Sequence, residues 1–444
     1  MKKYRLDLSV AVVVFIIALL ERIRITYEYA WIFAEPVKFV QGDDGHYFAI
    51  MMSLLEHEVF GIEGVPTAYR MPFFPLFGAF WHWLLGPEPY VILPVLLVLG
   101  AFIPVGTYLL ARYFINPLSS FIVSCLMIFD KDMVVYSMLY MTEILFCFCV
   151  LWGMLAFGQV QQTLRWPWAV ITGLLFGCAT LTRANFGPFV FVVLLWFIWL
   201  GRARSQAARE GRGEGLARPA NPHPPAREGR GAASPHPPAY LKSAITHAVI
   251  IGAIVGAMWL PWVIRNYLVF EAFIPFTTQG GSAYYGIYHD QVANQPFGIK
   301  YGLWQNLTPP VSDAILQDSV ALDRVQRELA RNWIQEHRYE AAVLALMQVF
   351  QLWAPFSENP LAMIIYTLIG LPALAIFALR DKHPMLISWL ILAFMMSAMA
   401  LASVGVARYA YPLRPVLALT TFMLFQEVAQ HISKRRGMLA IRDT

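Results

Sequence analysis

Long apolar segments, bounded by charged or proline-containing stretches, recur through this 444-residue chain and restrict it to a membrane fold. Hydrophobic residues make up 58% of the chain and charged residues only 14%, whereas soluble domains carry ~25% charged residues. Because a backbone in lipid must satisfy its hydrogen bonds internally, such segments are expected to be helices. The sequence therefore predicts an all-α polytopic membrane protein.

About ten transmembrane helices are predicted, with both termini in the cytoplasm. The first apolar segment, Leu8 to Leu20, has no small-residue cleavage site after it, which favours an uncleaved span over a signal peptide. Residues 339–356 are expected to lie along the membrane. The other spans are predicted at residues 91–113, 118–129, 144–157, 169–181, 186–200, 244–264, 361–379, 385–404 and 416–428.

The chain divides into two membrane modules and a linker. Residues 1–200 form the first module, which contains an outward loop from about residue 24 to 88. Residues 243–444 form the second, with an outward loop at residues 265–338; interfacial helices are expected in both loops, at 47–55 and 323–337. Between the modules, residues 201–242 are rich in Arg, Gly and Pro and predict a disordered cytoplasmic linker, either a tolerated insertion or a functional tether.

The basic residues and the cysteines exclude other classes of protein. The net charge of +5 is concentrated in loops and tails, where the positive-inside rule already explains it, so no nucleic-acid partner is predicted. The four cysteines lie in apolar segments without histidines at zinc-binding spacing, and they are interpreted as core residues.

Two adjacent carboxylates, Asp43 and Asp44, stand between Gly42 and Gly45 in the first outward loop. A carboxylate close to lipid is costly unless it faces water, a cation or a reacting proton, so this pair is a candidate functional site. The alternative is that the aspartates cap the helix that follows.

Several cations lie on the side of the membrane that the positive-inside rule disfavours. Each belongs to the outward end of a different segment, and each could singly be a snorkelling interface residue. As a set they predict an anion between them, either the acids Asp43, Asp44 and Glu143 or a lipid phosphate. These cations are Arg70, Lys131, Arg183, Arg265 and Arg408.

The order of short motifs resembles that of the GT-C glycosyltransferases, in particular the dolichyl-phosphate-mannose protein mannosyltransferases and the bacterial aminoarabinose transferases. The resemblance covers nearly the whole chain apart from the linker, and no single motif is specific. The motifs are the acid pair at 43–44, Y-R-x-P-x-x-P at 69–75, T-E-I-L at 142–145, G-L-L-F-G-C-A-T-L-T-R at 173–183, W-L-P-W-V-I-R-N-Y at 259–267 and R-Y-A-Y-P-L-R-P at 408–415.

The resemblance implies a cell-membrane enzyme whose active site faces outward. It implies transfer of a sugar from a polyprenyl-phosphate carrier to a lipid, glycan or protein acceptor outside the cytoplasm. Asp43 is then the expected catalytic base, Asp44 its partner and Glu143 a further acid of the site. The chain departs from the family where it has Asp-Asp in place of the Asp-Glu of many relatives, and its loops are too short for an extra folded domain.

An inverting single displacement is the mechanism we expect from these residues. A polyprenyl phosphate is already a good leaving group, so the site needs cations for the phosphate and an aspartate for the acceptor proton. Arg265 and Arg408 are expected to hold the phosphate, and Arg70 or Arg183 to balance the acids. Tyr69 and Tyr409 are the other candidate substrate-binding residues, although tyrosines at this depth can also form an interface belt.

A metal requirement stays open on the sequence alone. Paired carboxylates can bind Mg²⁺ or Mn²⁺, but no further oxygen ligands follow at a fixed spacing. His46 lies next to the pair, and a lone histidine in a turn is more often structural.

The main competing function is a lipid-linked-sugar transporter or flippase without catalysis. A transporter is expected to place its charges near the bilayer midplane and often to show repeated halves. Here the charges lie at one face and the two modules share no pattern, which favours an enzyme. A non-catalytic lipid-binding or scaffold role is the third possibility.

Overall fold

The computed structural model describes residues 2–29, 42–88, 91–210, 237–294, 304–353 and 360–442. Helices dominate these residues, as predicted, and one short antiparallel pair of strands accompanies them, β1 (Gly61–Ile62) with β2 (Val65–Pro66). Outside the two long loops, the helices are α1 (Lys2–Glu28), α5 (Leu93–Ala111), α6 (Pro117–Ile128), α7 (Lys131–Tyr136), α8 (Glu143–Thr163), α9 (Trp166–Thr182), η2 (Ala184–Phe186), α10 (Gly187–Arg209), α12 (Pro237–Phe270), α18 (Pro360–Ala362), the π-helical η3 (Met363–Gly370), α19 (Leu371–Asp381), α20 (Pro384–Ala402), the 3₁₀-helical η4 (Ala407–Leu413) and α21 (Arg414–Arg442). The loop helices are α3 (Asp43–Glu56), α4 (Phe73–Leu85), α13 (Gly280–Ile287), α14 (Asp290–Ala293), α15 (Asp313–Gln317), α16 (Ser319–Glu336) and α17 (Arg338–Trp353).

Six stretches of helix among the described residues are long and apolar enough to cross a membrane. They lie in α5, α8, α10, α12, η3 with α19, and α20, and the chain is accordingly a multi-pass membrane protein. The shorter apolar helices α6 and α9 stand at predicted spans but have 12 and 17 residues, fewer than the ~20 that cross a bilayer. The predicted number of about ten crossings therefore stays a prediction.

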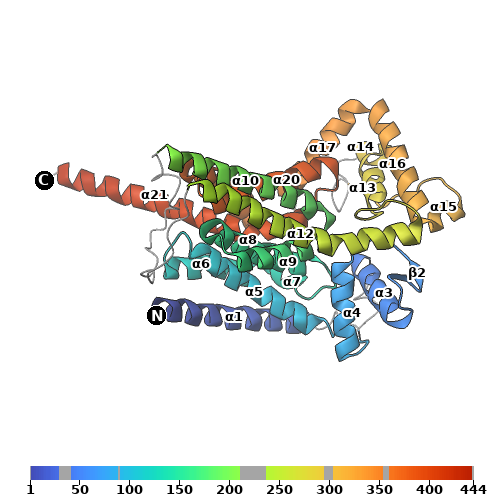
Figure 1. Ribbon diagram of the computed structural model, residues 1–444, viewed down its shortest axis with the longest axis horizontal. Helices are drawn as coiled ribbons and strands as arrows, with labels where there is room; N and C mark the ends of the chain where they lie inside the picture. Colours follow the sequence, from blue (N-terminus) through green and yellow to red (C-terminus); the bar gives the residue numbers. More distant parts are fainter. Residues whose placement is uncertain are drawn as a thin grey trace.

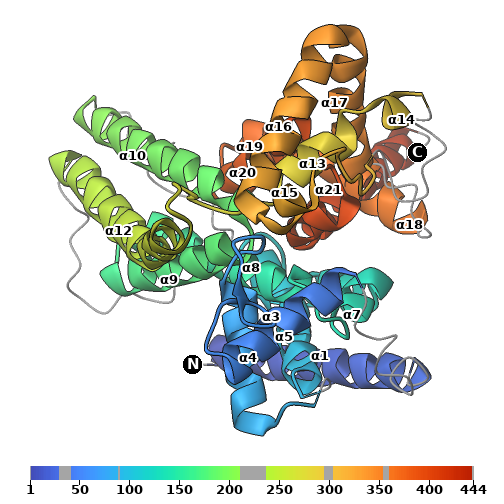
Figure 2. The same cartoon turned by 90° about the vertical axis from the view of Figure 1, so that its right-hand side faces the viewer.

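The molecule is elongated, and its two ends differ (Figure 1). Both chain termini lie towards one end, whereas α3, α4 and α13 to α17 form the other. Figure 2 views the end that carries the loop helices, with α3 and α4 on one side and α13 to α17 on the other. Both loops that were predicted to face outward thus lie at the same end of the bundle.

The helix α8 lies at the centre of the bundle, where it packs against α5, α9, α20 and η4. Its Phe146 and Phe157 side chains are almost fully buried, and Phe157 contacts Phe176 of α9 with ring centroids 6.0 Å apart. Gly153 makes this contact possible, because a Cβ atom there would lie 2.8 Å from the Phe176 ring. The close packing fixes the position of α8, whose first residue is Glu143.

The loop helices follow the sequence predictions with shifted ends. The helix predicted at 323–337 is α16, and the segment predicted to lie along the membrane is α17, apart from residues 354–356, which fall outside the described residues. Both ends of the predicted linker are helical, because α10 continues to Arg209 and α12 begins at Pro237. Its central part, residues 211–236, falls outside the described residues.

Candidate active site

The acid pair lies in the first turn of α3, four residues earlier than the predicted start of that helix. Gly42 occupies the N-cap position with a φ of 67°, a left-handed conformation that glycine adopts without strain. Neither aspartate is the cap, so the interpretation of the pair as capping residues is wrong. Their side chains are free for the site, and the positive end of the helix dipole favours their charge.

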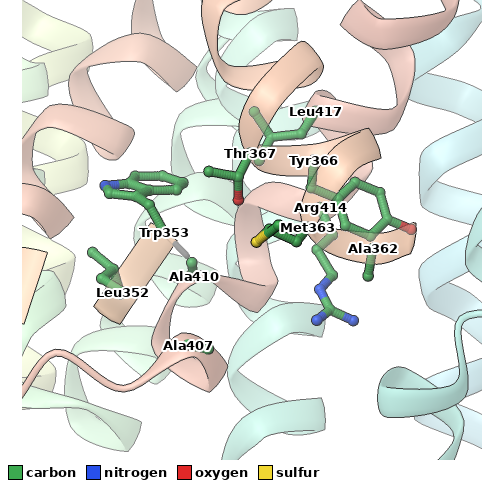
Figure 3. Close-up of a pocket in the computed structure, with 10 residues that line it drawn as sticks. All are labelled: Leu352, Trp353, Ala362, Met363, Tyr366, Thr367, Ala407, Ala410, Arg414 and Leu417. Atoms are coloured by element: carbon green, nitrogen blue, oxygen red, sulfur yellow. The ribbon is translucent and has the colours of Figure 1, made fainter. Parts of the chain in front are cut away.

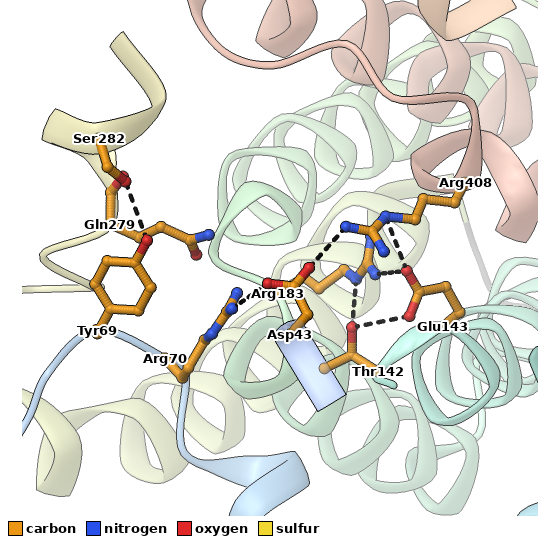
Figure 4. Close-up of polar contacts among 9 residues, drawn as sticks. All are labelled: Asp43, Tyr69, Arg70, Thr142, Glu143, Arg183, Gln279, Ser282 and Arg408. Atoms are coloured by element: carbon orange, nitrogen blue, oxygen red, sulfur yellow. Dashed lines mark hydrogen bonds and ion pairs between the residues drawn. The ribbon is translucent and has the colours of Figure 1, made fainter. Parts of the chain in front are cut away.

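Asp43 is held by two arginines from distant parts of the chain (Figure 4). Its Oδ1 accepts a hydrogen bond from Arg70, and its Oδ2 accepts one from Nη2 of Arg408 at 2.9 Å. Burial alone would raise the pKa of Asp43, but the charges and hydrogen bonds of Arg70 and Arg408 outweigh it and lower the pKa to about 2. Asp43 is therefore a fixed negative charge.

Glu143 forms the second half of the same charged cluster. Its side chain is fully buried, and its Oε1 lies 2.6 Å from Nη2 of Arg183 and 3.4 Å from Nε of Arg408. Arg183 also donates from Nε to Oγ1 of Thr142 at 2.9 Å and lies 4.7 Å from the ring centre of Tyr409. Arg408 thus bridges Asp43 and Glu143, and residues from the outward ends of several segments meet at one point.

Asp44 differs from its neighbour because, within the described parts of the chain, no hydrogen bond or ion pair holds its carboxylate. Burial raises the pKa of Asp44, and repulsion by the charges of Glu143 and Asp43 raises it further. Arg408 and Arg70 lower it by less, so the pKa reaches about 7. Burial, helped by the charge of Arg70, lowers the pKa of His46 to about 4. At neutral pH Asp44 is accordingly the group of this pair that exchanges a proton.

Two arginines of the cluster keep unused donors. Nε of Arg70 and Nη1 of Arg183 are buried and have no hydrogen-bond acceptor among the described residues, whereas Nε of Arg408 faces Oε1 of Glu143. A buried guanidinium N–H without an acceptor is costly, and an anionic oxygen satisfies it with a strong charge-assisted bond. The cluster therefore suits an anionic ligand such as a phosphate.

Arg265, near the end of α12, lies apart from this cluster. Its Nη1 and Nη2 donate to the carbonyl oxygens of Thr67 and Phe60, each at 2.8 Å, and it makes no described contact with Asp43, Asp44 or Glu143. The rings of Phe60, Trp262 and Phe270 surround its guanidinium. Arg265 therefore lies outside the charged cluster, and its phosphate contact stays a prediction.

The tyrosines of the loops have separate places. The hydroxyl of Tyr69 lies 3.2 Å from Oγ of Ser282, which joins the first outward loop to α13 of the second (Figure 4). Tyr285 and Tyr288 are buried, and Tyr288 packs on Trp333. Tyr69 and Tyr409 therefore border the charged cluster, whereas Tyr285 and Tyr288 belong to the packing of the second loop.

A divalent cation does not fit this set of donors. Both oxygens of Asp43 and one oxygen of Glu143 face guanidinium groups at ion-pair distance. Among the residues described, no group of three histidine, cysteine or acidic side chains is arranged to hold a metal ion. The arginines thus stand where Mg²⁺ or Mn²⁺ would have to bind the carboxylates.

A second buried charged cluster was missed by the sequence analysis. Arg414 lies at 2.5 Å from Asp130 and 2.7 Å from Asp132, and the hydroxyl of Tyr366 donates to Asp130 at 2.9 Å. The signals were present, since an acidic pair flanks Lys131 and a second arginine follows Arg408 in the R-Y-A-Y-P-L-R-P motif. The sequence could not indicate that Arg414 pairs with Asp130 and Asp132.

Comparisons with known proteins identify the fold. No protein-family model and no curated protein matches the chain. Solved structures of an oligosaccharyltransferase from Archaeoglobus fulgidus do match. The apo form gives a TM-score of 0.53 at 13% identity over 97% of this chain, and the form tethered to an acceptor peptide gives 0.51 at 16% identity over 97%.

A third structure, archaeal oligosaccharyltransferase AglB from the same organism in complex with an inhibitory peptide and a dolichol-phosphate, matches 98% of this chain with a TM-score of 0.50 and 14% identity. The same transferase has also been solved with Zn and sulfate. This chain covers only 50–52% of the length of these proteins. The resemblance read from the motifs is thereby confirmed at the level of the fold: the chain shares its membrane fold with these structures of an archaeal oligosaccharyltransferase.

Proposed function

We propose that this protein is an integral-membrane glycosyltransferase that moves a sugar from a polyprenyl-phosphate carrier to an acceptor outside the cytoplasm. The observation that carries the proposal is the cluster in which Arg408 bridges Asp43 and Glu143 while the guanidinium groups of Arg70 and Arg183 retain buried, unused donors. Such a cluster offers binding for a phosphate and a carboxylate for an acceptor proton at the same place. The dolichol-phosphate bound by the archaeal transferase of the same fold supports a carrier of this class.

The proposed reaction is a single displacement with inversion at the sugar carbon. The acceptor hydroxyl attacks the anomeric carbon, the bond to the phosphate oxygen breaks, and the polyprenyl phosphate leaves with the bonding electron pair. Arg70, Arg183 and Arg408 stabilise the charge that develops on the phosphate, in a buried site where such stabilisation is strongest. No strong general acid is needed, because the phosphate leaves as a stable anion.

We assign Asp44 as the base that accepts the acceptor's proton. The motif resemblance favours Asp43 for this role. Both oxygens of Asp43 are occupied by Arg70 and Arg408, and its low pKa makes it a poor base. The carboxylate of Asp44 is not held in this way, and its pKa of about 7 lies near the optimum for a general base at neutral pH. Asp43 then orients the two arginines that meet the phosphate.

A direct assay tests the function. Purified protein in lipid nanodiscs is mixed with polyprenyl-phosphate sugar labelled in the sugar and with a panel of lipid, glycan and peptide acceptors. We expect cleavage of the donor and labelling of one acceptor class, and a fall of at least about a hundredfold on Arg408→Ala, since removing one donor to developing charge costs that much.

The matched control is Asp313→Asn, a change at an exposed residue of α15, which should leave turnover unchanged. A donor returned intact with every acceptor, although transported across vesicles, would identify a transporter instead. Turnover in EDTA should equal turnover without it, because guanidinium groups face Asp43 and Glu143 and leave Asp44 as a single carboxylate, too few ligands for a cation.

A further inference from the structure

The short helix α7 is held at both of its ends by buried arginines. At its start, Asp130 is the N-cap residue, and its Oδ1 accepts from the backbone N of Met133 at 3.1 Å. At its end, Oγ of Ser137 accepts from Nε of Arg22 at 3.3 Å, and Arg22 is fully buried. A helix of 6 residues has little stability of its own, so these contacts determine where it lies.

Arg414 joins η4 to α7. Its Nη1 donates to Oδ1 of Asp130 at 2.5 Å and its Nη2 to Oδ2 of Asp132 at 2.7 Å. Tyr366 of η3 donates to the remaining oxygen of Asp130 at 2.9 Å. The side chains of Arg414 and Asp130 are only 9% and 1% exposed, and in Figure 3 Arg414 and Tyr366 lie beside each other at the edge of a small cavity.

Aromatic packing strengthens the same junction. The guanidinium of Arg414 lies 4.0 Å from the ring centre of Tyr411, and the ring of Tyr411 meets that of Tyr136 of α7 edge to face at 5.3 Å. In a 3₁₀-helix residues three apart lie above one another, so Arg408, Tyr411 and Arg414 form one row along η4 and its end. The row runs from the second charged cluster to the first.

We infer that Arg414 is a positioning residue of the proposed transfer reaction: its pairing with Asp130 and Asp132 holds η4 against α7 and so sets Arg408 between Asp43 and Glu143. The inference rests on the proposed function. A 3₁₀-helix has poor hydrogen-bond geometry, and η4 also contains Pro412, which lacks a backbone N–H. Its position is accordingly set by side-chain contacts, among which the two hydrogen bonds of Arg414 join it to α7.

A double-mutant cycle tests this inference with Arg408→Lys, Arg414→Lys and the combination. Lysine keeps the charge but cannot bind two carboxylates as a planar fork. We expect Arg414→Lys alone to lower kcat/KM by roughly ten- to a hundredfold, because a shift of about 1 Å in a positioned group costs this much. In the Arg408→Lys background, Arg414→Lys should lower kcat/KM by less than about twofold, because the guanidinium that Arg414 positions is already absent.

The pH profile gives a second readout that a merely structural role would not move. The charged groups that act on Asp44 are Glu143, Asp43, Arg408 and Arg70. His46 follows two residues later on α3, and His82 of the packed helix α4 instead lies within hydrogen-bond distance of Gly86 and Tyr140. Arg408 lowers the pKa of Asp44, so its displacement in Arg414→Lys should move the acid limb of kcat/KM to higher pH. The inference is overturned if the acid limb of the pH profile does not shift and the effects of the two substitutions on kcat/KM are additive.

Arg112→Lys is the matched control. Arg112 pairs with Asp7 at 2.8 Å, its side chain is 8% exposed, and Tyr108 donates to the same carboxylate, so chemistry and burial resemble those of Arg414. Arg112 is the C-cap residue of α5 and makes no described contact with the charged cluster. Its replacement should leave kcat/KM within about twofold of wild type. An equal loss in Arg112→Lys and Arg414→Lys also overturns the inference.

The failure of the inference and that of the proposed function are distinguishable. If the wild type does not cleave the donor, the proposed function fails; if the wild type is active and the cycle is additive, only the role of Arg414 fails. Should Arg414→Lys not fold, Tyr366→Phe removes one hydrogen bond to Asp130 and keeps the ring. It should lower kcat/KM by about two- to fivefold in wild type and have no effect with Arg408→Lys; equal effects in both backgrounds contradict the inference.

Discussion

Asp43 and Asp44 are chemically identical neighbours, and their surroundings separate them. Two guanidinium groups lower the pKa of Asp43 to about 2, whereas burial and the nearby Glu143 raise that of Asp44 to about 7. A pair of titratable groups whose pKa values are pushed apart in this way can divide two tasks, one as a fixed charge and one as a proton acceptor. Adjacent positions in the sequence carry no sign of this division.

The pH dependence follows from the assignment of Asp44 as base. Only the deprotonated carboxylate accepts a proton, so kcat/KM should fall about tenfold per pH unit below pH ~7 and level off above it. A profile measured from about pH 5 to pH 9 checks this. With Asp43 as the base, the profile would be flat across that range, because Asp43 ionises near pH 2.

At the scale of elements, the segment that carries Tyr69 and Arg70 is clamped between α12 and the start of the second loop. Arg265 of α12 binds the carbonyls of Thr67 and Phe60, and the backbone N of Thr278 donates to the carbonyl of Ala68 at 3.0 Å. Arg70 follows directly, and it meets Asp43. The position of Arg70 in the charged cluster therefore depends on the position of α12.

Arg265→Ala should thus act as a stability change. Each charge-assisted hydrogen bond contributes about 1.5–3 kcal/mol, and losing two, with partial replacement by water at this half-exposed position, should destabilise the loop by about 2–4 kcal/mol. The measurements are the midpoint of thermal unfolding and the rate of proteolysis in the loops. Arg324→Ala, at an exposed residue of α16, is the control.

Arg265→Ala also decides between two roles. An unchanged unfolding midpoint with a raised KM for the donor would restore the phosphate contact that the sequence predicted for Arg265. A lowered midpoint with unchanged donor affinity supports the clamp.

At the scale of the whole molecule, function is placed at one end. Both sets of loop helices, including α3 with Asp43 and Asp44, lie opposite the chain termini (Figure 1). This separation is the one that positive-inside topology requires, with basic α21 residues such as Lys434 on the side away from the site.

Cysteine labelling tests this topology. In sealed vesicles, a cysteine at exposed Asp313 and one at exposed Lys434 should react with a membrane-impermeant maleimide from opposite sides. The wild-type chain is the control, since its four free cysteines are buried or only partly exposed. Labelling of both positions from one side would contradict the arrangement of the two ends.

The sequence by itself determined the membrane class, the approximate helices and most members of the site. Apolar length and charge bias are local properties, so Asp43, Glu143, Arg70, Arg183 and Arg408 could be selected before any contact was known. Their grouping on one face was predictable because each lies at the outward end of its segment.

Only the tertiary structure decided which arginine meets which acid. Arg408 reaches Asp43 across 365 positions of the chain, and Arg414 reaches Asp130 across 284. Arg265, equally plausible from its position, turns to backbone carbonyls instead. The physical reason is that an ion pair and a shifted pKa depend on distance and burial, which arise from the packing of distant helices and have no counterpart in the local order of residues.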